Sequence, residues 1–140
     1  MFDFPSPEWM AAYKDAINSN EAYKVAGKDW TYGPVAMMVK ADPSVGLNED
    51  TAMLLDVHQG VCRDCKLVTG KEADTAPFVI VAPYSTWKLV IRKGVDPTKA
   101  MMQGKLKLVK GALPVMVKHV SASKELVEST TKVPTKFRDE

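Results

Sequence analysis

Five short segments of the chain carry runs or alternations of hydrophobic residues, and each pattern predicts a β-strand. Residues 34–41 form an almost continuous apolar run, which is typical of a strand buried on both faces. Within 51–58, apolar and more polar residues alternate, so every second side chain faces the same side. The other three predicted strands are a segment of 60–70 that follows a turn, 76–84 and 105–109.

A helix is predicted near the start of the chain. Ser6 is a good N-cap, Pro7 fits the first helical position, and Glu8 suits the positive end of the helix dipole. Apolar residues then recur at helical spacing, which gives this helix one hydrophobic face. The residues on that face are Trp9, Tyr13, Ala16 and Ile17.

Two short helices are predicted between the fourth and fifth strands. The first, residues 85–94, has Ser85 or Thr86 as its cap and a glycine at its end. The second, residues 96–104, has Asp96 as its cap, a proline at its first position and a glycine at its end. The fifth strand follows at once, so a helical crossover of the βαβ type is expected to bring it into the sheet.

The last helix is predicted from an apolar face that starts after residue 111. That face comprises Leu113, Met116, Val117, Val120 and Val127. His119 has no recognisable partner in the sequence and is expected at the surface. The order of elements is helix, four strands, two short helices, strand and long helix, which predicts a two-layer α+β domain.

Length and composition favour one globular domain, residues 1–140, with a loose tail after about residue 134. The chain is 46% hydrophobic and 26% charged, with a net charge of +2. Basic residues are scattered without interleaved aromatics, so a nucleic-acid partner is not expected. No apolar run reaches the roughly 18 residues of a membrane span, and the first ten residues do not resemble a signal peptide. A cytoplasmic location is expected.

Cys62 and Cys65 have the two-residue spacing of a zinc knuckle or a redox pair, and His58 lies four residues upstream. A closed zinc site needs four ligands, and the sequence has no second cluster of cysteine or histidine. These cysteines are therefore expected in a turn at the tip of a hairpin, without a cofactor. A small metal or redox module built on the three residues remains the competing hypothesis.

The segment "MMQGKLKLVKG", residues 101–111, joins a methionine-rich helix end to a strand. Methionine usually fills cores, but its unbranched thioether also suits a cavity that adapts to an apolar ligand. Gln103 lies at this junction, where it could hold a ligand's polar end or cap the preceding turn. The methionines expected to face inward are Met37, Met38, Met53, Met101, Met102 and Met116.

Three quoted segments carry a resemblance to a known family. "DPTKAMMQGKLKLVKGALPVMVKHV", residues 96–120, resembles the signature of the sterol carrier protein type 2 (SCP-2-like) domain. "AMLLDVHQGVC" resembles that family's strand ending in Asp-x-x-x-Gly, and "APFVIVAPYSTWKLVIRKGVDP" its next strand and helix. The resemblance implies a five-stranded mixed sheet covered on one face by helices, enclosing an apolar tunnel. The cysteine pair is not part of the family pattern.

The resemblance implies non-enzymatic binding or transfer of a long-chain lipid: fatty acid, acyl-CoA, sterol or phospholipid. No catalytic motif contradicts this, and an accessory domain that presents an apolar substrate to a separate enzyme is an alternative. Transient membrane contact and a homodimer are compatible with it. The residues expected at the ligand are Met37, Met38, Met53, Leu55, Phe78, Ile80, Trp87, Val90, Ile91, Met101, Met102, Gln103, Leu106, Leu113, Met116, Val117 and Val120.

Overall fold

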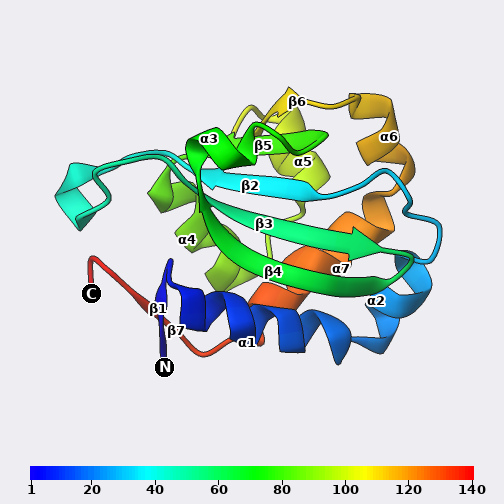
Figure 1. Ribbon diagram of the computed structural model, residues 1–140, viewed down its shortest axis with the longest axis horizontal. Coiled ribbons are helices and arrows are strands. Elements are labelled where there is room, and N and C mark those ends of the chain that lie inside the picture. Colours follow the sequence, from blue (N-terminus) through cyan, green and yellow to red (C-terminus); the bar gives the residue numbers. More distant parts are fainter.

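The computed structural model describes residues 1–140 and confirms the predicted α+β architecture (Figure 1). Five strands form a mixed sheet in the order β4-β3-β2-β5-β6. β2 and β5 are parallel, and the other neighbours are antiparallel. These strands are β2 (Val35–Val39), β3 (Thr51–His58), β4 (Val61–Thr69), β5 (Phe78–Ala82) and β6 (Lys107–Lys110). The lysine and leucine segment therefore lies in the sheet, as predicted.

The direction of β6 differs from the predicted βαβ connection, because β6 runs antiparallel to its neighbour β5. The reversal takes place just after the second short helix. There the N–H groups of Lys105 and Leu106 both donate to the carbonyl of Ala100, at 2.9 and 3.3 Å. The chain thus folds back over the helix end and enters the sheet beside β5 in the opposite sense.

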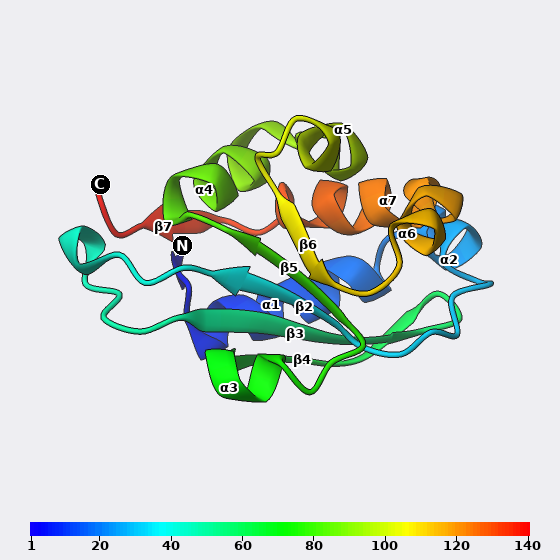
Figure 2. The ribbon, with the colours of Figure 1, turned by 90° about the horizontal axis from the view of Figure 1, so that it is seen from above.

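Six helices cover one face of the sheet, and one short helix, α3, lies on the other (Figure 2). The face covered by the six is called the inner face below. None of the helices combines the length and the apolar composition needed to cross a bilayer. The helices are α1 (Pro7–Asn18), α2 (Glu21–Ala26), α3 (Gly70–Ala73), α4 (Tyr84–Lys93), α5 (Pro97–Met102), α6 (Leu113–Lys118) and α7 (Val120–Thr130), and a 3-10 turn covers Pro43–Val45.

The central strands are buried on both faces, as the continuous apolar run predicts. In β2, Val35, Met37 and Val39 belong to the large core under the helices. Ala36 and Met38 belong to a smaller cluster on the outer face, beneath α3. This alternation follows from the two-residue period of a strand.

Two predicted helix starts are confirmed in detail. The Ser6 side chain accepts a hydrogen bond from the N–H of Trp9 at 3.1 Å, and Pro7 opens α1. The Asp96 carboxylate caps α5 in the same way. The predicted cap of α4 is wrong, because this helix begins at Tyr84 after Pro83 and has no side-chain cap.

The helical segments at the start and at the end of the chain are each divided into two helices. Asn20 caps a separate helix, α2, through a hydrogen bond from Tyr23 N–H at 3.2 Å. Near the C-terminus, α6 and α7 meet at His119, which leaves the helical conformation. His119 is buried against Trp30, with ring centroids 5.2 Å apart, so the expectation of a surface histidine is wrong.

The chain after Pro134 differs from the predicted loose tail. β7 (Thr135–Phe137) pairs in parallel with β1 (Phe2–Phe4), and both termini lie together beside α1 (Figure 1). Phe137 is 2% exposed and packs against the Phe4 ring, with centroids 6.1 Å apart. Burial of this aromatic side chain holds the end of the chain against the core.

Candidate functional site

A largely enclosed apolar cavity lies between the inner face of the sheet and the helices. Its volume is about 40 Å³, and ten of its twelve lining residues are hydrophobic. Ligand pockets usually measure roughly 300–1,000 Å³, so this conformation is closed to a lipid. The lining residues are Tyr23, Trp30, Val35, Met37, Val57, Ile80, Pro97, Met116, Ala122, Ser123, Leu126 and Val127.

The sheet and the helices supply opposite walls of this cavity. Met37 of β2 and Ile80 of β5 are paired in register and project from the inner face. Met116 of α6 and Ala122 of α7 come from the helical layer. Two methionines therefore face the space from both sides, and their flexible side chains can adapt to a ligand's shape.

The cavity approaches the surface between α5 and α7. Pro97 opens α5, while Ser123 and Leu126 lie one turn apart on α7. Ser123 and Leu126 are half-buried, whereas most of the other lining residues are buried. A ligand entering here would have to separate two helices, one of which has only six residues.

The lining contains no charged side chain. The Trp30 indole N–H donates to the Gly33 carbonyl at 2.9 Å, so this polar group is already paired. Burial, and to a lesser extent the nearby Cys62, raise the pKa of the Tyr23 phenol, which stays neutral at physiological pH. The cavity is thus suited to a hydrocarbon chain, and a charged head group would remain outside it.

The structure brings together most of the residues predicted at the ligand, although few of them line the cavity. Met37, Ile80 and Met116 line it directly. A second group is buried in the surrounding core, and Met101 and Val120 are half-buried. That second group comprises Met53, Leu55, Phe78, Trp87, Val90, Ile91 and Leu106.

Five predicted residues do not face the inner core. Met38 belongs to the opposite face of the sheet, because strand neighbours point to opposite sides. Met102 is 80% exposed and Gln103 is also exposed, since the end of α5 projects into solvent. Leu113 and Val117 are exposed on α6. The expectation that Met38 and Met102 face inward is therefore wrong.

Other lining residues were missed by the prediction. Val57 continues the alternation of its strand and Val127 the apolar face of its helix, so the sequence indicates that both point inward. Tyr23, Trp30 and Ala122 reach the cavity only because α2, a loop and α7 converge on it. No local pattern encodes that convergence.

The two cysteines lie in β4 and not in a turn. A bulge between Asp56 and Val57 shifts the register, so Cys62 pairs with Val57 and Cys65 with Leu55. Both thiols are free and buried in the inner core. His58 lies at the end of β3, and no group of three or more His, Cys, Asp or Glu is arranged to hold a metal. The geometry does not support the metal module.

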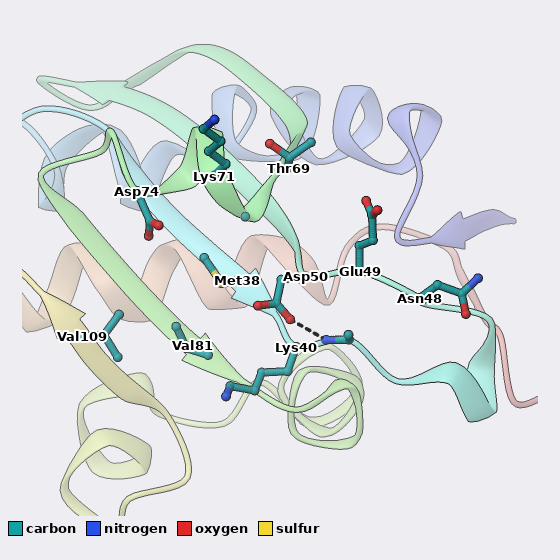
Figure 3. Close-up of a pocket in the computed structure, with 12 residues that line it drawn as sticks. Met38, Lys40, Asn48, Glu49, Asp50, Thr69, Lys71, Asp74, Val81 and Val109 are labelled. Atoms are coloured by element: carbon teal, nitrogen blue, oxygen red, sulfur yellow. Dashed lines mark hydrogen bonds between the residues drawn. The ribbon is translucent and has the colours of Figure 1, made fainter.

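The outer face of the sheet carries an open basin of about 820 Å³ (Figure 3). Lys40, Lys71 and Asp74 line it together with Asp50, whose carboxylate accepts the N–H of Ala41 at 2.8 Å. The basin has side chains of both charges and is open to solvent. It lacks the enclosure that an apolar ligand requires, so the cavity on the inner face is the better candidate site.

Comparison with known proteins agrees with this geometry. The model of the SCP-2 sterol transfer family matches residues 20–120. A crystal structure of a sterol carrier protein 2 is 35% identical, with 91% of this chain and 97% of that chain covered and a TM-score of 0.85. A conserved hypothetical protein from Thermus thermophilus is 34% identical, with 94% and 90% covered and a TM-score of 0.84.

A more distant similarity supports the fold only. Sterol carrier protein 2 from Yarrowia lipolytica, in its apo form, is 14% identical, with 87% of this chain and 88% of that chain covered and a TM-score of 0.53. No curated protein sequence matches the chain significantly. Since the family model spans most of the 140 residues and two structures share about a third of the sequence, this chain belongs to the SCP-2 sterol transfer family.

Proposed function

We propose that this protein binds one long-chain lipid between its sheet and its helices and carries it without changing it chemically. The observation that carries the proposal is the enclosed cavity with its almost wholly apolar lining. The family match supports the same function. A fatty acid or fatty acyl ester fits the lining best, because its hydrocarbon chain needs no polar partner and its head group can stay at the mouth.

Binding requires the cavity to enlarge, because about 40 Å³ is far smaller than a long acyl chain. The helices at the mouth are suited to this movement. α5 has only six residues, and such a short helix depends on tertiary packing for its stability. Separation of α5 from α7 would open the core along the line between Pro97 and Leu126.

The proposal is tested by filling the cavity from α7. Ala122 is 4% exposed and lines the space, so Ala122→Leu puts a larger side chain where the ligand would lie. We expect the dissociation constant for a fluorescent fatty acid to rise about tenfold or more. The loss of folding stability should stay below the about 1–3 kcal/mol of ordinary overpacking, because part of the space is already empty.

Ala76→Leu provides the matched control. Ala76 is 3% exposed and belongs to the outer cluster, away from the cavity. This substitution should cost about 1–3 kcal/mol and leave fatty-acid affinity unchanged. Equal affinity for Ala122→Leu and the unsubstituted protein would contradict the proposed site.

A further inference from the structure

Positive charge is concentrated in one segment of the chain. Residues 97–124 contain six lysines and no aspartate, glutamate or arginine. The segment alone therefore carries +6, and since the net charge of the chain is +2, the remaining residues together carry −4. A chain with a nearly balanced total charge thus has a strongly basic part. The six lysines are Lys99, Lys105, Lys107, Lys110, Lys118 and Lys124.

The same segment exposes large aliphatic side chains. Met102 is 80% exposed, Val109 is 60% exposed, and Leu113 and Val117 are each 47% exposed. They come from α5, β6 and α6, which follow one another along one edge of the sheet (Figure 2). Exposed hydrophobic residues on consecutive elements of one side of the molecule indicate an interaction surface. The side of the molecule formed by α5, β6 and α6 is called the basic edge below.

The basic edge has a shallow hollow, and its lysines form no ion pairs within the protein. Met101, Val109 and Leu113 share a shallow hollow of about 470 Å³ that joins its three elements. None of the six lysines belongs to an ion pair within the protein. Lys110 alone has a partner, the carbonyl of Asp74, which its Nζ contacts at 2.6 Å. The lysines of the basic edge other than Lys110 are therefore free to meet an external anion.

The chemistry of the basic edge favours an anionic lipid surface over other partners. Methionine, valine and leucine can enter the interfacial region of a bilayer while the long lysine side chains reach lipid phosphates. A nucleic-acid surface would be expected to contain arginine and stacking aromatics, and residues 97–124 contain neither. A second copy pairing along β6 is disfavoured, because lysines on an edge strand oppose such pairing.

We propose that the basic edge docks this protein onto anionic membranes, with Met102, Val109, Leu113 and Val117 inserted among the head groups and the lysines paired with lipid phosphates. The basic edge includes α5, whose Pro97 lines the cavity, so docking would place the cavity near the bilayer. The proposal goes beyond ligand binding. It is tested on the protein without added ligand, so its failure and that of the proposed carrier function are distinguishable.

The test is flotation with vesicles of phosphatidylcholine, with and without phosphatidylglycerol. We expect the protein to float only with the anionic vesicles and to be released as salt is raised. Lys105→Glu/Lys107→Glu should lower the partition coefficient at least about tenfold. Met102→Ser/Leu113→Ser should also lower it, although the charges are retained, because apolar insertion is lost.

Matched controls lie elsewhere on the surface. Lys28→Glu/Lys136→Glu changes charge equally at two exposed lysines outside the segment, and Val25→Ser/Val61→Ser removes two exposed valines. Both controls should float like the unsubstituted protein. Thermal melting and fatty-acid titration without vesicles should be unchanged for the two basic-edge variants, which excludes misfolding and loss of the cavity as causes.

Three results would overturn the proposal. The first is equal flotation with neutral and anionic vesicles, and the second is an equal loss in the basic-edge and control variants. The third is the absence of flotation together with binding of an oligonucleotide or an acidic protein that Lys105→Glu/Lys107→Glu abolishes. That third result would assign the basic edge to a different class of partner.

Discussion

At the residue scale, Cys62 and Cys65 show how a single bulge changes the role of a motif. In a regular strand, residues three apart point to opposite faces. The bulge opposite Asp56 and Val57 brings both thiols to the inner core, where they are buried. Contact with Cys62, followed by burial, raises the pKa of the Cys65 thiol, which therefore stays protonated at neutral pH. Both cysteines of the spacing that resembled a metal or redox motif thus pack in the inner core.

The two cysteines should respond differently to substitution by serine. Cys62 Sγ already donates to the carbonyl of Asp64 at 3.2 Å, so a hydroxyl there has a partner. A hydroxyl at Cys65 has no carbonyl partner, only the Cys62 thiol, and should cost about 1–3 kcal/mol of folding free energy, measured by urea unfolding. We expect Cys62→Ser to cost less, and Cys65→Ala to cost less than Cys65→Ser. If Cys65→Ser leaves the folding free energy unchanged, the position is effectively solvated and the account is wrong.

At the element scale, the glycines on either side of β6 are required for different structural reasons. Gly104 has a φ of +74°, and a Cβ added there would meet nothing within 4 Å. Gly111 has a φ of +105°, and an added Cβ would lie 2.4 Å from a ring atom of Phe78. The first glycine is needed only for its backbone conformation. The second is also needed for close packing between the start of the last helices and the core.

Alanine substitutions should separate these two requirements. Gly104→Ala is expected to cost about 1–2 kcal/mol, the strain of a left-handed backbone with a side chain. Gly111→Ala should lower the folding free energy by a further amount of about 1–3 kcal/mol, since Phe78 must also move. Chemical denaturation of the two variants measures the difference. Equal costs would mean that the contact with Phe78 relaxes without strain.

Local signals account for the parts of the fold that the sequence predicts. The five strands follow from apolar runs and alternation, and α1 and α5 follow from caps at Ser6 and Asp96. The pairing of β1 with β7 joins the two ends of the chain, so no local pattern could reveal it. The break at His119 lacks a glycine or proline signal and arises where the ring packs against Trp30.

The same distinction applies to the candidate site. Met116 could be predicted because it lies on the apolar face of its helix, and Met37 and Ile80 because they lie in continuous apolar runs. Met102 and Leu113 have an equally apolar character in the sequence but end on the surface. Which apolar side chains become lining and which stay exposed depends on how α5, α6 and α7 meet the sheet. That arrangement is set by contacts between distant segments.

At the scale of the whole molecule, the cavity, its mouth and the basic edge form a connected arrangement. The cavity lies within the large core, which includes residues from both the sheet and the six helices. Pro97 of α5 and Ser123 and Leu126 of α7 line it, and the basic edge begins at α5. A carrier needs such proximity, because a lipid leaving a bilayer has to reach the cavity without crossing water.

The most direct test of the carrier function is native mass spectrometry of the protein after removal of bound lipid by organic extraction. A long-chain fatty acid is then added at increasing concentrations up to the micromolar range. We predict a single adduct per chain that saturates, and we predict that Ala122→Leu largely prevents it because the side chain occupies the cavity. Absence of any saturable adduct, or several adducts that form equally on both proteins, would contradict lipid binding in this cavity.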